Sequence, residues 1–189
     1  MKKYTGIFAL AGFLLLGGCF MPKEINAATL TAQDLAHDNF HTVQEGRLYR
    51  SGQIPRARIA AYLQEYGIKT IINLRSPAEN AVCCWGEKGA AKSCHASVVH
   101  VPMSAGKMST PQEINELLAA FDKAQEPLLI HCSQGINRTG EACALWLLEK
   151  CGATNAQALE MFDTKYGYNK KSRPEKYQLI ESWQTSFKK

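Results

Sequence analysis

HCSQGINRTG, residues 131–140, lies between two segments of different character. The apolar run 127–130 before it is typical of a buried strand, and residues 141–150 after it are typical of a helix. A strand, a short loop and a helix in this order predict an anion site, because loop amides converge there and the helix N-terminus adds partial positive charge. Gly135 permits backbone conformations that a side chain forbids. Arg138 carries a planar fork that suits two phosphate oxygens.

The chemistry predicted for this loop is nucleophilic attack on a bound phosphate. Cys132 lies at the loop entrance, beside His131 and before a helix start, where the pKa of a cysteine falls. A thiolate that faces a bound phosphate is a nucleophile facing an electrophile. Thr139 is placed to hydrogen-bond the sulfur and so make it a better leaving group in a second step. The opposing interpretation is a buried cysteine with a structural arginine, which requires the register of cysteine, glycine and arginine to be accidental.

The stretch resembles the His-Cys-x5-Arg-Thr signature of the cysteine-based protein tyrosine and dual-specificity phosphatases. The resemblance implies that Cys132 is the nucleophile, that Arg138 holds the phosphate and that Thr139 is the hydroxyl after the arginine. The substrate-binding cradle is then formed by Ser133, Gln134, Gly135, Ile136 and Asn137, together with Arg138.

Two further segments resemble a bacterial subgroup of this superfamily. Leu48–Gln53 is similar to its RSGQ segment, and Asn73–Arg75 matches the NLR that follows a strand in that subgroup. With the phosphate loop, the matches extend over roughly residues 48–140, most of the expected domain.

Strand and helix patterns alternate along the chain. Short strands are expected within 39–50, a central strand over 68–74 and another strand over 95–103; helices are expected over 55–66, from 111, over 154–166 and over 174–187. This alternation predicts an α/β fold with a mainly parallel central sheet flanked by helices, and the resemblance implies that the fold is of the protein tyrosine phosphatase type. Residues 76–95 are the least regular, with a short helix at Ser76–Pro77 and loops marked by Gly86 and Gly89.

The first 19 residues predict export. Lys2 and Lys3 precede the apolar segment 4–16, and LGGC at 16–19 resembles the lipobox of bacterial lipoproteins, in which the cysteine is lipidated. We therefore expect a signal peptide at 1–19, a tether at 20–38 and a phosphatase domain at 39–189, lipid-anchored through Cys19 in the periplasm. Cleavage near Ala27 and an uncleaved anchor are the alternatives, and both also place the domain outside the cytoplasm.

The charge balance suits a small anionic substrate. The chain has 22 basic and 17 acidic residues and a net charge of +5, which is too mild to indicate a nucleic-acid partner. The expected reaction passes through a phosphocysteine and requires neither a metal nor an organic cofactor. The expected partners are a phosphorylated protein, with phosphotyrosine preferred, or a small phosphate such as an inositol phosphate. A phosphate-binding pseudophosphatase is the alternative from another class, and a rhodanese-type sulfurtransferase is a weaker one.

One part of the resemblance is missing. Members of the superfamily usually carry an aspartate, on a separate loop, that protonates the leaving oxygen. By position that loop is SAGKMS, residues 104–109, which has no carboxylate. General acid catalysis is worth about 10²–10⁴-fold, so the absence matters most for alkyl phosphates and least for aryl phosphates or phosphoanhydrides. Glu113, Glu79 and Glu87 are the candidate substitutes, although each is also expected as an ordinary surface or helix-start carboxylate.

The remaining cysteines allow several interpretations. Cys83 or Cys84 is expected to pair with Cys94 in an oxidising compartment, and the rival is a redox switch in which one of them traps Cys132. Cys143 and Cys151 are expected in the core. A metal site at Cys83, Cys84, Cys94 and His95 does not match a standard zinc spacing, so no metal is predicted.

Overall fold

The computed structural model describes residues 29–80 and 84–184 of the 189-residue chain. The leader with Cys19, the first part of the expected tether and Cys83 lie outside the described residues, so the predictions made for them stay predictions. Within the two described ranges, no helix has the length and apolar character needed to span a membrane.

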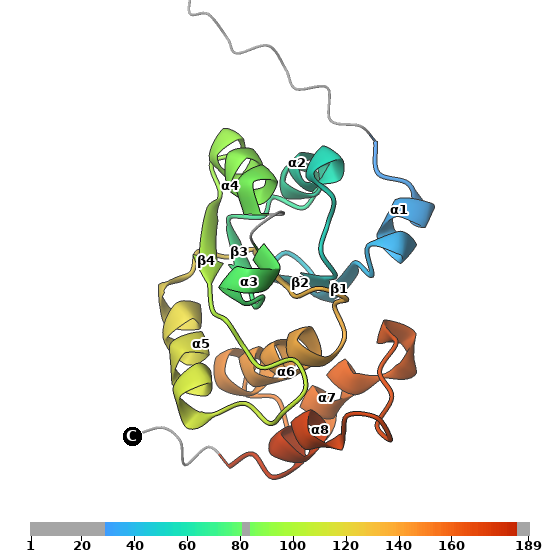
Figure 1. The fold of residues 1–189 in the computed structure, drawn as a ribbon, viewed down its shortest axis with the longest axis vertical. Coiled ribbons are helices and arrows are strands. Elements are labelled where there is room, and N and C mark those ends of the chain that lie inside the picture. Colours follow the sequence, from blue (N-terminus) through green and yellow to red (C-terminus); the bar gives the residue numbers. More distant parts are fainter. Residues whose placement is uncertain (1–28, 81–83, 185–189) are drawn as a thin grey trace, which may run out of the picture.

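Five strands form one sheet in the order β1-β2-β5-β3-β4 (Figure 1). They are β1 (His41–Gln44), β2 (Leu48–Ser51), β3 (Thr70–Asn73), β4 (Ser97–His100) and β5 (Leu128–His131). β1 is antiparallel to β2, and the other neighbouring strands are parallel, which confirms the predicted sheet. Because β5 lies at the centre, its carboxyl end is the natural place for a ligand site in an open α/β sheet.

Helices cover both faces of the sheet (Figure 1). They are α1 (Ala32–His37), α2 (Arg56–Glu65), α3 (Pro77–Asn80), α4 (Cys84–Ser93), α5 (Pro111–Lys123), α6 (Asn137–Cys151), α7 (Asn155–Leu159) and α8 (Pro174–Glu181), with the 3-10 turns η1 (Glu160–Phe162) and η2 (Thr164–Tyr166). The strand side chains alternate between two cores, as a pleated strand requires. On β5, Leu128 and Ile130 join the core with α5–α8, whereas Leu129 joins the core with α2 and α4.

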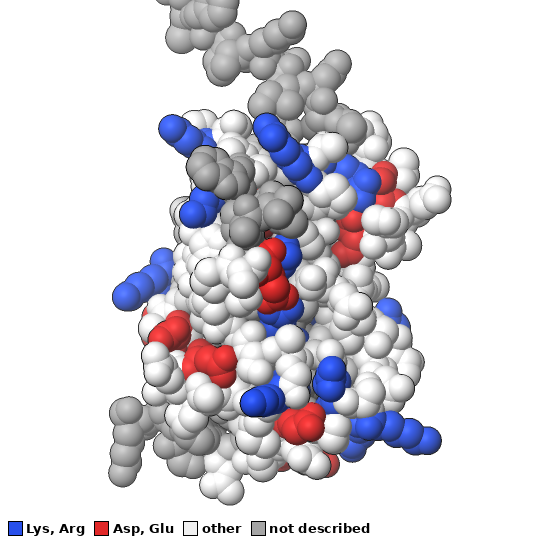
Figure 2. Space-filling model, viewed as in Figure 1, with Lys and Arg blue, Asp and Glu red and all other residues white. Residues whose placement is uncertain are grey.

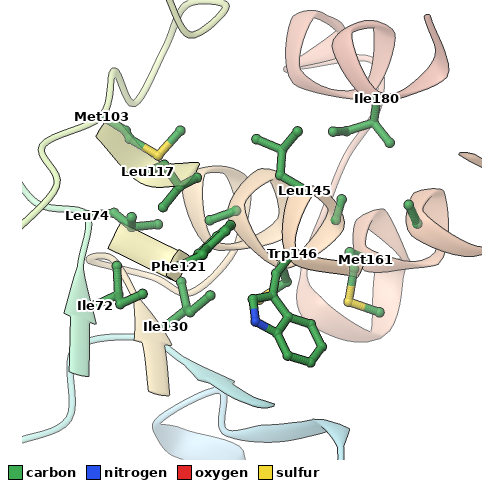
Figure 3. Close-up of a cluster of buried hydrophobic side chains, with 14 of the residues drawn as sticks. Ile72, Leu74, Met103, Leu117, Phe121, Ile130, Leu145, Trp146, Met161 and Ile180 are labelled. Atoms are coloured by element: carbon green, nitrogen blue, oxygen red, sulfur yellow. The ribbon is translucent and has the colours of Figure 1, made fainter. Parts of the chain in front are cut away.

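Helix α6 is the centre of the larger core. Figure 3 shows Leu145 and Trp146 of this helix between Ile130 of the sheet and Ile180 of α8. Trp146 is fully buried, and so is nearly every residue of the first two turns of α6. The helix ends at Gly152, whose φ of 64° is the left-handed conformation of a helix C-cap. Packing on all sides therefore fixes the start of α6, where Arg138 lies.

The region 76–95 is more regular than the sequence predicted. The short helix at Ser76–Pro77 is confirmed as α3, but the expectation of loops at Gly86 and Gly89 is wrong, because both lie within α4. A Cβ at Gly86 would come within 2.7 Å of Arg56 Cγ. This glycine therefore permits close packing of α4 on α2 and does not break the helix.

The expected tether also contains structure. Thr31 begins α1 with a capping box that it forms with Asp34. Asp38 is buried and accepts hydrogen bonds from Arg58 Nε and Tyr62 Oη of α2, both at 3.0 Å. These contacts attach the chain to α2 at the residue immediately before the expected boundary at residue 39.

The C-terminal helices differ from the prediction in their lengths. The helix expected over 154–166 is short α7 followed by η1 and η2, and α8 ends at Glu181. On the face shown in Figure 2, Lys and Arg side chains are interspersed with Asp and Glu side chains.

Candidate active site

The loop between β5 and α6 forms a small pocket at the carboxyl end of the sheet. Its volume is about 50 Å³, and its lining residues are Cys132, Ser133, Gln134, Asn137, Arg138 and Ala105. The N-terminus of α6 has no side-chain cap, which leaves its amides available to an anion. Cys132 and Arg138 therefore face one space, as the sequence predicted.

Gly135 is required by the shape of the loop. Its φ is 73°, and a Cβ at this position would lie 2.5 Å from the backbone of both Ser51 and Gly52. Residues with a side chain rarely adopt this φ, and here the side chain would also collide with the end of β2. The phosphate loop thus rests directly on the backbone of the Leu48–Gln53 segment.

Cys132 is set up to ionise. Its burial, at 3% exposed, opposes the charged form. Hydrogen bonds from Thr139 and the backbone of Gly135, together with the charge of Arg138, outweigh burial and lower the pKa of the Cys132 thiol below its usual value. Thr139 is fully buried beside the sulfur. The three residues predicted to be catalytic are therefore brought together.

Arg138 is held by a carboxylate from another element. Its Nη1 and Nη2 donate to Glu79 Oε2 and Oε1, each at 2.9 Å, and Nη1 also donates to the Leu74 carbonyl at 3.2 Å. The hydrogen bonds from Arg138 are the main reason that the pKa of Glu79 falls to about 2. This bidentate pair fixes the plane of the guanidinium beside the pocket.

His131 has a buried carboxylate partner. Its Nε2 lies 2.9 Å from Glu87 Oε2, and both side chains are at most 3% exposed. Its Nδ1 lies 3.2 Å from the Cys132 carbonyl oxygen, so each ring nitrogen has an oxygen atom close to it. Burial alone would raise the pKa of Glu87, but His131 and Asn73 overcome this and lower it to about 2.

Comparison with known proteins places this site in a family. The family model described as PTP-NADK, a DSP-PTPase phosphatase fused to NAD+ kinase, matches residues 23–178. The chain belongs to this DSP-PTPase family. It is a cysteine-dependent phosphatase, which confirms the class of enzyme that the His-Cys-x5-Arg-Thr signature predicted.

Relatives agree with this membership. The dual specificity protein phosphatase TpbA of Pseudomonas aeruginosa strain UCBPP-PA14 is 29% identical over 157 residues, which cover 80% of this chain and 67% of TpbA. A crystal structure of a cysteine-to-serine variant of TpbA with pTyr has a TM-score of 0.61 at 19% identity, covering 87% of this chain and 95% of that one. The core catalytic domain of the PP-IP phosphatase SIW14 of S. cerevisiae, in complex with citrate, has a TM-score of 0.59 at 23% identity. The match covers 79% of this chain and 88% of that one. At these identities the solved structures show a shared fold.

Compared with the DSP-PTPase pattern, the acid loop is different. Residues 104–109 form an irregular segment that contains no carboxylate, and its Ala105 lines the pocket. The far end of the loop is fixed, because buried Ser109 donates to Glu141 Oε2 of α6 at 2.8 Å. Glu141 forms a buried ion pair with Lys176 of α8.

The three glutamates considered as substitute acids have other partners. Glu79 pairs with Arg138, and Glu87 pairs with His131. Glu113 completes the capping box of α5, accepting from the amides of Ser104 and Thr110 at 2.7 Å each. None of these three carboxylates is presented to the pocket as a proton donor in this arrangement.

A second, larger pocket adjoins the first and was not predicted. Its volume is about 330 Å³, and it is lined by His37, Asp38, Asn39, Gly52, Gln53, Ser133 and Gln134. Ser133 and Gln134 are common to both pockets. The residues that form its far wall are distant from the phosphate loop in sequence, so no local pattern could have indicated it.

Cys94, Cys132, Cys143 and Cys151 are free thiols. Cys94 is free and faces α2, with its Sγ 3.9 Å from the Ala60 carbonyl, so the expected disulfide is absent at this residue. Cys143 is buried in the core as predicted, but Cys151 is exposed, because α6 ends there at the surface. In the part of the chain that the structure describes, no three or more His, Cys, Asp or Glu are grouped to hold a metal ion.

Proposed function

We propose that the protein hydrolyses phosphate monoesters with good leaving groups, phosphotyrosine-type protein substrates first, through a phosphocysteine on Cys132. The observation that carries this proposal is the meeting of a thiol of lowered pKa and the Arg138 fork in one pocket whose third wall is Ala105. A nucleophile and an anion clamp are present, and none of the described residues that line this pocket carries a carboxyl group. Esters whose leaving oxygen departs without a proton are favoured by such a site.

The proposed reaction has two steps. The Cys132 thiolate attacks phosphorus, so that an S–P bond forms while the bond between phosphorus and the leaving oxygen breaks. The phosphoryl oxygens are held by Arg138 and the loop amides, and the leaving oxygen takes its proton from water. In the second step water attacks phosphorus, the S–P bond breaks, and phosphate leaves while Thr139 stabilises the returning thiolate.

Relatives support two substrate classes. One TpbA structure is described as a complex with pTyr, and SIW14 is described as a PP-IP phosphatase. Both an aryl ester and a phosphoanhydride have leaving groups that depart without strong acid assistance, so the small anionic phosphate is the second candidate. The small volume of the Cys132 pocket, about 50 Å³, matches a phosphoryl group, and the rest of a substrate would lie outside it.

Hydrolysis of p-nitrophenyl phosphate by wild type, Cys132→Ser and Cys151→Ser tests the mechanism. We expect Cys132→Ser to lose at least about 10³-fold in kcat. Cys151→Ser is the matched control, because its thiol is exposed and lies at the opposite end of α6. Equal rates for wild type and Cys132→Ser would contradict the phosphocysteine. Phosphate binding without turnover by the reduced wild type would support the pseudophosphatase instead.

A substrate panel then separates the classes. We expect kcat/KM to be higher for a phosphotyrosine peptide than for the matched phosphoserine peptide, because the tyrosine leaving group has a pKa of about 10. Inositol phosphates and inositol pyrophosphates complete the panel. Preference for a pyrophosphate over every peptide would assign the second candidate, and equal rates on phosphoserine and phosphotyrosine would contradict the leaving-group argument.

We also propose that the domain is exported and anchored by a lipid on Cys19. This rests on the sequence of residues 1–19 alone. Detergent phase partition of the full chain and of Cys19→Ala is the test. Wild type in the aqueous phase would contradict lipidation, whereas a shift of only the variant to the aqueous phase would support it.

A further inference from the structure

We propose that Arg50 is a positioning residue that holds the phosphate loop from behind, so that the amides of the loop are turned toward the substrate. This proposal rests on the proposed phosphatase function of the same site. Arg50 lies on β2, outside the pocket, and no role follows for it from the signature at 131–140. Its importance is visible only in the contacts of its side chain.

Arg50 is an arginine buried without a carboxylate. It is 0% exposed, and among the residues that the structure describes it forms no ion pair with Asp or Glu. Its Nη2 donates to the Gly135 carbonyl at 2.8 Å and lies 3.5 Å from the Ile136 carbonyl, while its Nη1 donates to the Met161 carbonyl at 2.8 Å. The ring of Tyr166 lies 3.7 Å from the guanidinium carbon. Burying a charged group costs free energy. An arginine surrounded only by neutral partners therefore requires an explanation.

The explanation lies in the carbonyls of Gly135 and Ile136, which face Arg50. In a trans peptide unit the C=O and the following N–H point in opposite directions. Because the Gly135 carbonyl is turned toward Arg50, the N–H of Ile136 is turned away from Arg50. The Ile136 carbonyl, at a longer distance, orients the N–H of Asn137 in the same sense. Arg50 therefore fixes the orientation of successive amides at the start of α6, which is the arrangement that binds an anion.

The position of Arg50 is itself fixed on both sides. β2 pairs with β5 so that Arg50 lies opposite Ile130, one residue before His131. Gly52 allows the chain after Arg50 to lie against the loop, because a Cβ there would be 3.2 Å from the backbone of Ser133 and Gln134. η1 supplies the Met161 carbonyl and η2 supplies the ring of Tyr166. The side chain thus connects the sheet, the loop and the C-terminal helices.

Its charge acts on the pocket as well. Arginine remains protonated even when buried, so Arg50 places a permanent positive charge behind the loop in a region that water does not reach. This charge favours the Cys132 thiolate and a phosphate dianion in front of the loop. A purely structural arginine would affect folding but would have no reason to change the ionisation of Cys132.

The test compares Arg50→Met and Arg50→Lys with wild type. The first readout is the pH dependence of Cys132 alkylation by iodoacetamide, measured with and without phosphate. We expect Arg50→Met to raise the apparent pKa of Cys132 by about one unit and to weaken protection by phosphate about 10-fold. Lysine keeps the charge but lacks the fork that reaches both the Gly135 and the Met161 carbonyls. Compared with Arg50→Met, Arg50→Lys should therefore restore the pKa of Cys132 but only part of the phosphate binding.

Controls keep the result interpretable. Arg47→Met removes an arginine three residues earlier, which pairs with Glu126 at 2.7 Å near the other end of β2, and should leave both readouts unchanged. Melting temperatures of all variants report on folding, and Arg50→Lys carries the test if Arg50→Met does not fold. A folded Arg50→Met with wild-type alkylation and phosphate protection would overturn the proposal. Since alkylation needs no turnover, failure of hydrolysis and failure of the Arg50 role remain distinguishable.

Discussion

The phosphate loop and the acid loop both follow parallel strands, but they are built differently. The phosphate loop is held by side chains from other elements: Arg138 pairs with Glu79, His131 pairs with Glu87, and the Gly135 carbonyl accepts a hydrogen bond from Arg50. The acid loop is held at its two ends, by the hydrogen bond from Ser104 to Glu113 and by the hydrogen bond from Ser109 to Glu141, and between them it contributes Ala105 to the pocket. Under the proposed function, this difference means that the site binds and attacks phosphorus, while the choice of substrate depends on the leaving group.

The largest expected effect comes from breaking the clamp of the phosphate loop. Arg138→Lys keeps the charge but loses the bidentate fork, and we expect kcat/KM for p-nitrophenyl phosphate to fall about 10³-fold. Steady-state kinetics measure this loss, with Arg47→Lys as the control arginine outside the site. A decrease below tenfold would mean that the loop amides hold the phosphate without the fork.

The buried pair behind the nucleophile gives a pH-dependent prediction. Glu87 has a pKa of about 2 in the folded protein against an ordinary value of 4.5. Its stabilising effect is therefore fully present above pH 4.5 and is lost as the pH falls toward 2, by at most about 3 kcal/mol in the free energy of unfolding.

Urea unfolding between pH 5 and about 2 measures this effect for wild type and Glu87→Gln. We expect the variant to be less stable at neutral pH and to have a shallower dependence on pH in this window. Glu79→Gln is the matched comparison, because Glu79 has a similar pKa but its side chain is 35% exposed, so solvent reduces its contribution. Parallel pH curves for wild type and Glu87→Gln would contradict the assignment.

Restoring a carboxylate to the acid loop sharpens the comparison. Ala105→Asp places an acid in the wall of the Cys132 pocket, and we expect kcat for a phosphoserine peptide to rise about 10- to 100-fold, toward the lower end of general acid catalysis. Ala105→Asn, similar in size but unable to donate a proton in this way, is the control. An equal gain with asparagine, or no new limb in the pH–rate profile of the aspartate variant, would show that the position is unsuited to proton transfer.

The smallest effect is expected where the acid loop joins the core. Ser109→Ala removes the hydroxyl that donates to Glu141, and we expect the free energy of unfolding to fall by about 1–3 kcal/mol with little change in kcat for an aryl phosphate. Thermal unfolding and p-nitrophenyl phosphate kinetics check the two parts. A large loss of kcat would show that the position of this loop matters for more than the proton.

The strand, loop and helix around Cys132 could be predicted from the sequence because their signals are local. An apolar run, a glycine at a required positive φ and a helix start follow one another within a few residues. The loops expected in α4 were wrong, because Gly86 is needed for close packing on Arg56, and a glycine gives the same local signal in either case. The prediction for Gly86 failed because its packing partner, Arg56, lies far away in the sequence, and not because of the chemistry of either residue.

The partners behind the phosphate loop could not be predicted for the same reason. Arg50 is 85 residues from Gly135, and Glu87 is 44 residues from His131. The sheet order, with β2 and β3 on either side of β5, brings them together. The similarity at Leu48–Gln53 indicated that the segment matters, but only the geometry shows that its arginine orients carbonyls and its glycine permits contact.

The wall formed by Ser133 and Gln134 has a consequence for ligand chemistry. This wall borders both pockets. A non-hydrolysable aryl phosphonate with a short polar arm would therefore extend from the Cys132 pocket into the 330 Å³ pocket. Its two halves would then bind as one linked molecule, with an effective concentration set by the arm. The phosphonate half would address a loop common to many phosphatases. Selectivity would come from the arm, because His37, Asp38 and Asn39 belong to the segment that α1 attaches to this particular domain.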